Sequence, residues 1–211
     1  MHRLLNLFRK WKLRNYRPLI KILIYKDNLL HNLHAFQNTF PGIKIAPVLK
    51  SNAYGHGLVE IASILKNENI PFLCVDSYYE ALALRVKGIL TPILTIGYTP
   101  LENLKRKPPK NIAFSIISPE ELKQIAKTLN SPRSFHLKFD TGMHRHGILP
   151  EELPEVLQYI KQNKNINIEG AFSHFADADA PNSELTKIQI DRWNNIADTI
   201  QKELPKTKYF H

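Results

Sequence analysis

The sequence predicts a parallel α/β fold, because short apolar runs that suit strands alternate with amphipathic stretches that suit helices. An alternation of this kind, with helices of about 10–15 residues, is typical of β/α units in a parallel sheet. Strand-like runs of apolar and β-branched residues occupy positions 19–25, 43–49, 72–75, 92–96, 111–116, 134–139 and 166–172. From residue 43 onward we predict six strand–helix units, and residues 207–210 begin a seventh.

The helical stretches show apolar residues at the i, i+3, i+4 and i+7 spacing of one helix face. Four such stripes occur: Leu58–Ile61–Ala62–Leu65, Leu122–Ile125–Ala126–Leu129, Leu153–Val156–Leu157–Ile160 and Trp193–Ile196–Ala197–Ile200. Two helix starts also carry the spacing of a capping box, with Ser77 three residues before Glu80 and Ser118 three residues before Glu121. These signals place a helix after each of several predicted strands.

The alternation is compatible with a doubly wound sheet and with a (β/α)₈ barrel. No GxGxxG string follows any of the runs, which disfavours the dinucleotide-binding form of the doubly wound sheet. A complete barrel takes about 250 residues. If the fold is a barrel, this chain of 211 residues stops before the barrel closes.

The composition, with 43% hydrophobic and 23% charged residues, fits a single globular domain. The net charge of +10 is concentrated in residues 1–17, which hold six of the 29 basic residues and no acidic one. We predict a solvated basic arm there, and an amphipathic transit peptide or a membrane-surface helix stays open. No basic stripe indicates nucleic-acid binding, and no apolar run approaches the about 20 residues that span a bilayer.

Cysteine usage points to a reducing compartment. The only cysteine, Cys74, excludes an internal disulfide framework, and it lies in the apolar string PFLCVD, which favours buried packing over catalysis. We therefore expect a cytoplasmic protein.

Lys50 is the first candidate for chemistry, because it ends the run 43–49 and precedes the turn-forming string SNAYGHG. Ligands of parallel α/β folds bind at the carboxyl ends of the strands. A lysine there can form a Schiff base with an aldehyde, and Tyr54 offers a hydroxyl to an anion. An ordinary strand-end lysine followed by a turn explains the same residues about equally well.

Two later stretches add polar side chains at the same edge of the sheet. Strand alternation places three of them on one face, which would point into a barrel: His136, Lys138 and Asp140. Arg145 follows in a loop and could bind a carboxylate through its planar guanidinium. His174 follows the run 166–172 and could stack on an aromatic ligand or transfer a proton. A surface arginine and a buried, hydrogen-bonded histidine are the simpler alternatives.

A metal site is a weaker alternative. His56, His144, His146 and His174 could hold a divalent metal at a barrel mouth. No Asp or Glu at a strand end clearly completes this set, and two of the histidines lie in a loop, so we predict no metal. A Ser–His–Asp hydrolase is disfavoured as well, because no GxSxG elbow occurs.

Three stretches, in the order VLKSNAYGHG, KFDTGMHRHGI and SHFADAD, resemble the N-terminal barrel of bacterial alanine racemase. The resemblance covers nearly all of the chain after the basic arm, and the KxNAYGHG string is highly specific. It implies a domain over residues 18–211 with an incomplete (β/α)₈ barrel of the TIM type, the fold of type III pyridoxal-phosphate enzymes. About six β/α units and the start of a seventh would be present.

The resemblance also implies roles for five residues. Lys50 would hold pyridoxal 5′-phosphate covalently and act as one of two catalytic bases, on the D-alanine side. Tyr54 matches the tyrosine that hydrogen-bonds the cofactor phosphate, and His174 matches the histidine packed against the pyridine ring. Arg145 matches the arginine that orients cofactor and substrate, and Lys138 matches the often carbamylated lysine that fixes it. The implied reaction interconverts L-alanine and D-alanine, which supplies D-alanine for peptidoglycan.

The chain also departs from the family's pattern. It ends before the family's second base, a tyrosine of a C-terminal β-domain that acts across a homodimer interface. His144 and His146 replace residues that are usually small and apolar, and Ser173 replaces the usual threonine. We therefore expect this chain alone to be inactive or nearly so. A non-catalytic pyridoxal-phosphate-binding protein, or a degenerate fragment, is the alternative.

Overall fold

A computed structural model describes residues 19–211, so the predicted basic arm over residues 1–17 lies outside the described residues. The strands are β1 (Leu73–Val75), β2 (Ile93–Thr95), β3 (Ile112–Ile116), β4 (Arg133–Lys138), β5 (Ile166–Phe172) and β6 (Tyr209–Phe210). The helices are α2 (Lys26–Thr39), α3 (Lys50–Tyr54), α4 (Leu58–Leu65), α5 (Tyr78–Val86), α6 (Leu101–Leu104), α7 (Pro119–Thr128), α8 (Leu153–Gln162) and α9 (Glu184–Glu203), with a 3₁₀ turn η1 (Pro150–Glu152).

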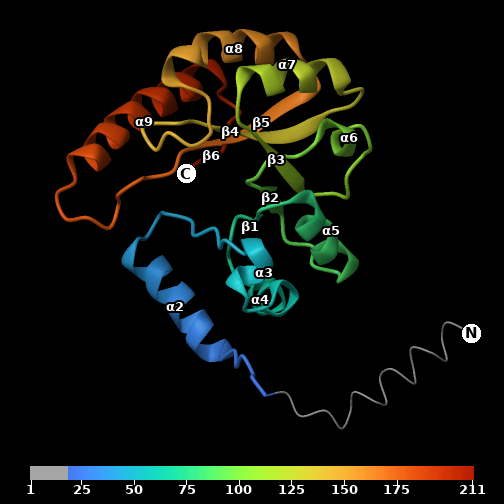
Figure 1. Cartoon of the computed structure of the whole chain (residues 1–211), viewed down its shortest axis with the longest axis vertical. Helices are drawn as coiled ribbons and strands as arrows, with labels where there is room; N and C mark the ends of the chain where they lie inside the picture. The colour runs from blue at the N-terminus through green and yellow to red at the C-terminus, as the bar shows by residue number, and fades with distance from the viewer. Residues whose placement is uncertain (1–18) are drawn as a thin grey trace, which may run out of the picture.

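The six strands form one parallel sheet in chain order, from β1 to β6. Each crossover connects neighbouring strands, and right-handed crossovers that all run the same way place their helices on one face of the sheet. Helices α5 to α9 lie around the outside of the curved sheet, and β1 and β6 form its two separate edges (Figure 1). This is a partly formed β/α barrel, as predicted, and not a doubly wound sheet.

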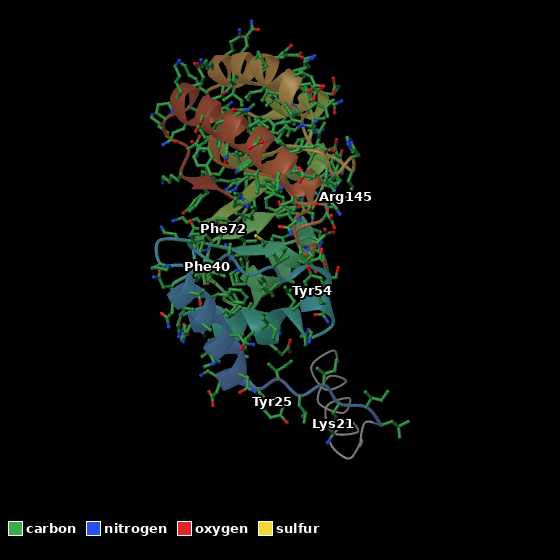
Figure 2. The ribbon with its side chains drawn as sticks, turned by 90° about the vertical axis from the view of Figure 1, so that its left-hand side faces the viewer. Lys21, Tyr25, Phe40, Tyr54, Phe72 and Arg145 are labelled. Carbon is green, nitrogen blue, oxygen red and sulfur yellow. The ribbon has the colours of Figure 1, made fainter. Side chains whose placement is uncertain are left out.

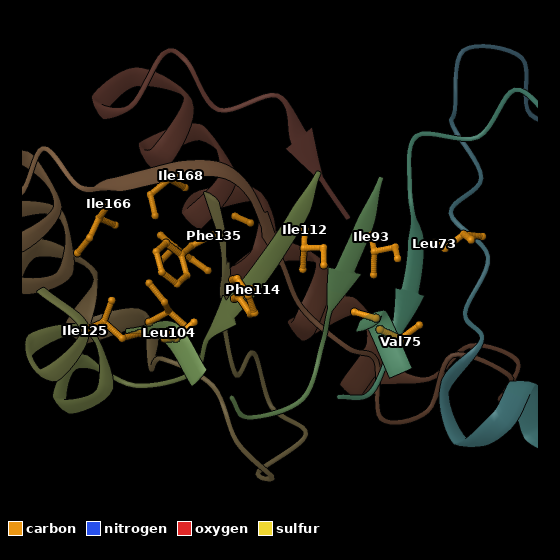
Figure 3. Packing of buried hydrophobic residues seen from close by; sticks show 14 of the residues in the cluster. Leu73, Val75, Ile93, Leu104, Ile112, Phe114, Ile125, Phe135, Ile166 and Ile168 are labelled. Carbon is orange, nitrogen blue, oxygen red and sulfur yellow. The ribbon is translucent and has the colours of Figure 1, made fainter. Parts of the chain in front are cut away.

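Side-chain alternation gives each face of the sheet its own apolar cluster. The larger cluster lies between the sheet and the helices, and includes Leu73, Ile93, Phe114 and Phe135 (Figure 3). The smaller one uses the alternate positions of β1 to β3 on the inner face, namely Phe72, Cys74, Leu94 and Ala113. Strands β1 to β3 are therefore buried on both faces, which explains why they read as continuous apolar runs and not as alternating ones.

The predicted helical stripes are confirmed. All four apolar residues of the stripe in α4 and all four of the stripe in α8 are buried. Ser77 and Ser118 cap α5 and α7 by accepting hydrogen bonds from the backbone N–H groups of Glu80 and Glu121. In a capping box the glutamate side chain would accept a hydrogen bond from the N–H of the capping serine. Here Glu121 accepts from the N–H of Ile117, and Glu80 accepts from the N–H of the residue before Ser77, one position earlier in each case.

The first two predicted strands need correction. Residues 19–25 form no strand, and their apolar side chains are largely exposed, with Leu19 at 98%. Figure 2 shows Lys21 and Tyr25 on a segment that extends away from the sheet. Residues 43–49 contribute only an isolated parallel bridge, from Val48 to Cys74. Only Leu49 of this segment is buried, whereas Ile43 and Val48 are exposed, so the apolar composition overestimated both the burial and the pairing of these residues.

Candidate functional site

Four of the five predicted site residues line one cavity at the carboxyl ends of the strands. The cavity has a volume of about 230 Å³ and is lined by Lys50, Lys138, Arg145 and His174, together with Asp76, Ile96, Gly97, His146 and Phe172. These side chains come from segments after β1, β2, β4 and β5 and from the start of α3. Because the strands are parallel, their carboxyl ends meet at one edge and bring distant stretches of sequence together.

The sequence predicted that Lys50 ends a strand. In the structure it begins the short helix α3 instead. The residues after it form a left-handed turn, with φ of 54° at Ser51, 57° at Asn52, 52° at Ala53 and 55° at Tyr54. Left-handed backbone costs about 1–2 kcal/mol per residue for L-amino acids, so this turn requires support from elsewhere. It lets the chain reverse directly after Lys50 while the lysine side chain stays at the cavity.

Asn52 provides much of that support. Its side-chain oxygen accepts a hydrogen bond from the N–H of Leu58 at 2.8 Å, and its own N–H donates to the Glu80 carboxylate at 3.0 Å. Gly57, with φ of 100°, donates its N–H to the Asn52 carbonyl at 3.0 Å. The predicted sharp turn is thus confirmed, and hydrogen bonds tie it to α4 and α5.

Tyr54 is not part of the cavity wall. Its side chain is 61% exposed, and its ring centroid lies 6.0 Å from Nζ of Lys50. Figure 2 shows Tyr54 and Arg145 on the same side of the molecule, whereas Phe72, beside the start of β1, lies on the other. Tyr54 therefore flanks the site at its open edge.

The loop that carries Arg145 is organised by one carboxylate. Oδ1 of Asp140 accepts hydrogen bonds from the N–H groups of Gly142, Met143 and His144, and Oδ2 accepts from the N–H of Arg145 at 3.1 Å. Burial alone would raise the pKa of the Asp140 carboxyl, but these four bonds outweigh it and lower the pKa. The ionised carboxylate therefore keeps the loop closed across the neutral range.

Gly147 closes the same loop. With φ of 151° it passes so near the end of β4 that a Cβ atom would lie 2.6 Å from the backbone nitrogen of Asp140. His144 has φ of 55°, a left-handed conformation that histidine adopts more readily than most residues.

Lys138 is the buried cation of the site. Only 5% of it is exposed, and its Nζ lies 2.7 Å from Nδ1 of His146. Burial, followed by the positive charge of Arg145, lowers the pKa of Lys138 to about 8, with Lys50 acting in the same direction. Burial and the neighbouring Lys138 also lower the pKa of His146. At neutral pH the imidazole is therefore uncharged, and it accepts a hydrogen bond from the Lys138 ammonium group.

His174 follows β5 and faces the same cations. Burial is the largest cause of its lowered pKa, and Arg145, Lys138 and Lys50 add to it in that order. The cavity thus joins three basic side chains and two neutral imidazoles, with Asp76 as its only acidic lining residue among those described. Such a set favours an anionic ligand, and the lysines can also react with a carbonyl group.

Sequence reasoning missed the partner of His136. As predicted, His136 points into the barrel, where its Nδ1 lies 2.9 Å from Nε2 of His211. The ring of His211 stacks on Phe172 with centroids 4.9 Å apart. Gly170 makes room for this pair, since a Cβ atom there would lie 2.5 Å from Nδ1 of His136. Strand alternation does not predict this contact, because the pairing of β4 and β5 shifts register between Phe135 and His136, so that Ile168 and Gly170 face opposite sides of the sheet.

The four histidines of the alternative metal site are not brought together. His146 contacts Lys138, whereas Nδ1 of His56 contacts the carbonyl of Ala53 at 2.9 Å. Within residues 19–211 no group of three His, Cys, Asp or Glu side chains is placed to hold a metal ion. Over the same residues, no helix is both long and apolar enough to cross a membrane.

Comparison with known proteins identifies the relatives of this site. Residues 24–211 match the protein family described as Alanine racemase, N-terminal domain. The alanine racemase of Carboxydothermus hydrogenoformans is 34% identical over 192 residues, which are 88% of this chain and 51% of that protein. Alanine racemase 1 of Clostridium acetobutylicum is 34% identical over 94% of this chain and 52% of its own length.

Solved structures agree in fold. Alanine racemase of Clostridium difficile 630, in complex with cycloserine, superposes with a TM-score of 0.78 at 36% identity, over 88% of this chain and 52% of its own. The Bacillus anthracis enzyme with bound L-Ala-P gives a TM-score of 0.78 at 27% identity, over 90% of this chain and 53% of its own. This chain spans about half the length of these relatives. With the family match over residues 24–211 and the agreement in fold, the chain belongs to the alanine racemase N-terminal domain family.

Proposed function

We propose that residues 18–211 form the cofactor-holding domain of an alanine racemase, which interconverts L-alanine and D-alanine with pyridoxal 5′-phosphate. The observation that carries the proposal is the shared cavity of Lys50, Lys138, Arg145 and His174. We further propose that the protein acts in the cytoplasm, that its D-alanine enters peptidoglycan and that the full-length enzyme is a homodimer.

The residues of the cavity fit pyridoxal 5′-phosphate. Lys50 supplies an amine for the aldehyde of the cofactor, and the cationic side chains suit its phosphate and the carboxylate of an amino acid. His174, neutral because of its lowered pKa, offers a flat ring to an aromatic ligand without adding charge. Tyr54, at the open edge, would provide a hydroxyl to the phosphate.

When bound, the cofactor supplies an electron-withdrawing ring that makes the α-proton of an amino acid acidic. The protein supplies position and proton transfer. Lys50 would accept the α-proton at Nζ on the D-alanine side and return it there in the reverse direction. Arg145, fixed by the Asp140 loop, would hold the substrate carboxylate, and Lys138 would hold Arg145 in place by carbamylation or by its contact with His146.

The relatives' structures support an amino-acid substrate. The Clostridium difficile enzyme is in complex with cycloserine, and the Bacillus anthracis enzyme contains L-Ala-P. A second candidate function is pyridoxal-phosphate binding without turnover. The same residues would hold the cofactor in both functions, so a turnover assay is needed to separate them.

An absorption titration tests the proposal. Pyridoxal phosphate added to the 211-residue chain should give a visible band that is lost in Lys50→Ala and kept in Lys127→Ala, an exposed lysine on α7. Borohydride reduction followed by peptide mapping should place the label on Lys50. No band at any accessible concentration, or a label on another lysine, would refute the role of Lys50. Alanine racemization assayed on the same sample separates the enzyme from the non-catalytic binder.

A further inference from the structure

The long helix α9 sends one amide side chain into the site region. Gln189 is fully buried, and it hydrogen-bonds two loops that belong to different strands. Its Nε2 donates to Oγ1 of Thr141 and to the carbonyl of His174, each at 3.1 Å. Its Oε1 accepts from the N–H of Ala176 at 2.9 Å. The orientation of the amide is fixed, because the backbone N–H of Ala176 must meet the oxygen and the His174 carbonyl must meet the nitrogen.

The hydroxyl groups next to Gln189 extend this connection in one direction. Ser173 donates its only hydroxyl proton to the carbonyl of Phe139 at 3.0 Å. The 2.7 Å contact between Thr141 and Ser173 must therefore use the Thr141 proton. Thr141 then accepts the hydrogen bond from Gln189. The series of hydrogen bonds thus runs in one direction, from Gln189 through Thr141 and Ser173 to the carbonyl of Phe139.

The two loops joined in this way carry two of the cavity's side chains. Thr141 follows Asp140, whose carboxylate organises the loop up to Arg145, and Arg192 of α9 donates to the Thr141 carbonyl at 3.0 Å. The other loop begins at Ser173 and carries His174. Gly142 packs against Gln189, since a Cβ atom there would lie 3.4 Å from Cγ of Gln189. Gln189 is thus a link between the Arg145 loop and the His174 loop.

We infer that Gln189 is a positioning residue that holds Arg145 and His174 at their separation across the cavity. It touches neither the cavity nor a reacting atom, and it acts through Thr141 and through the backbone of His174 and Ala176. The inference rests on the proposed function for its catalytic meaning, but its geometry can be tested without cofactor or turnover. Nothing in the roles expected for Lys50, Lys138, Arg145 and His174 requires this amide.

The test uses Gln189→Met, which keeps the length of the side chain and removes all three hydrogen bonds. Gln201→Met is the matched control, because Gln201 lies on the same helix and is exposed. In folded Gln189→Met, the Ala176 amide should exchange its proton about tenfold faster, as expected for one lost, partly buried hydrogen bond of about 1.4 kcal/mol. Amides within β5 should keep their wild-type rates, as should all of these amides in the control.

A histidine titration by NMR gives the second readout. If the loops separate, the His174 ring becomes more exposed to water and lies farther from the Arg145 charge. Its pKa should then rise toward 6.5. A purely structural role would lower stability and leave this pKa unchanged. Thr141→Val removes the middle hydroxyl and should also raise the pKa of His174, whereas Thr141→Ser should restore the wild-type value. The Thr141 variants decide the matter if Gln189→Met does not fold.

Wild-type exchange at Ala176 and a wild-type pKa at His174 in the folded variants would overturn the inference. That outcome would leave the proposed function untouched, since neither measurement involves pyridoxal phosphate or alanine. Conversely, if pyridoxal phosphate gives no absorption band with the wild-type chain, the proposed function is refuted. The positioning of the two loops by Gln189 would still stand.

Discussion

Replacing Lys138 by methionine should stabilise the fold, because this lysine carries a charge that the folded chain accommodates poorly. Lys138 is 5% exposed, and its ammonium group has one hydrogen-bond partner, the half-exposed loop residue His146. Arg145 and Lys50 add repulsion, and Asp140 offsets only part of it. Methionine keeps most of the aliphatic stem and removes the charge. His146 can then take a water molecule as its partner.

The magnitude follows from the pKa of Lys138, which is lowered from 10.5 to about 8. Each pKa unit corresponds to about 1.4 kcal/mol, so the charged lysine costs the folded state about 3 kcal/mol. The lost hydrogen bond to His146 returns about 1 kcal/mol of this. Lys138→Met should therefore raise the free energy of unfolding by about 1–3 kcal/mol at pH 7, an unusual sign for a change in a buried core.

The gain should depend on pH in one direction. Below pH 8 the folded and unfolded chains both carry the Lys138 proton, so the full cost of the charge is present. Between pH 8 and 10.5 the folded chain binds fewer protons than the unfolded chain, and the wild type becomes more stable as the pH rises. The advantage of Lys138→Met should thus shrink through this window.

Urea unfolding at pH 7, 9 and 10.5 measures both effects. Lys127→Met is the control, since Lys127 is exposed on α7, and it should match the wild type at each pH within about 0.5 kcal/mol. If Lys138→Met is less stable than the wild type at pH 7, or if its advantage grows as the pH rises, the account of Lys138 as a poorly accommodated charge is wrong.

Three further predictions concern a glycine in β5, the histidine pair inside the barrel and the cap of α7. Gly170→Ala should destabilise the fold by about 1–3 kcal/mol, because its Cβ would lie 2.9 Å from the Tyr209 carbonyl; an unchanged Tm would contradict this. The pKa of His136 is lowered to about 3 and that of His211 to about 4, so the unfolded chain takes up both protons first and stability should fall as the pH drops from 6.5 toward 4. Denaturation at pH 7, 5.5 and 4.5 should show this fall, and a flat profile would argue against a neutral histidine pair. Ser118→Ala removes the cap of α7 and should lower the urea midpoint by an amount equal to about 1 kcal/mol; a wild-type midpoint would show that this cap contributes nothing.

The parallel α/β order and most helices could be predicted because their signals are local. The stripe in α8, for example, repeats at the helical period, and each of its residues faces the sheet. The two strand predictions that failed lacked this property. The apolar run 19–25 suits a strand by composition, but a strand also requires a neighbouring ladder, and composition does not reveal whether one is in reach.

Within the site, the sequence indicated the residues but not their contacts. Asn52, Gly55 and Gly57 signalled a sharp turn, whereas the left-handed backbone of Ala53 depends on hydrogen bonds from α4 and α5. The contact between Lys138 and His146 depends on how the loop returns to β4, which only the folded chain determines. One signal for Gln189 was available, since it lies four residues before Trp193 on the apolar stripe of α9. A glutamine on a buried helix face requires hydrogen-bond partners for its amide group.

The charges of the cavity connect its stability to its ligand. Among the described residues, Lys50, Lys138 and Arg145 line it with only one acidic residue, Asp76, so an anion bound there would favour the charged form of Lys138 and raise its pKa. Pyridoxal phosphate should therefore raise the Tm of the wild type more than that of Lys138→Met, in which this repulsion is already absent. Thermal unfolding at several concentrations of the cofactor measures the difference. An equal or larger rise in the variant would mean that Lys138 does not interact with the ligand's charge, and that its burial serves the loop of Arg145 alone.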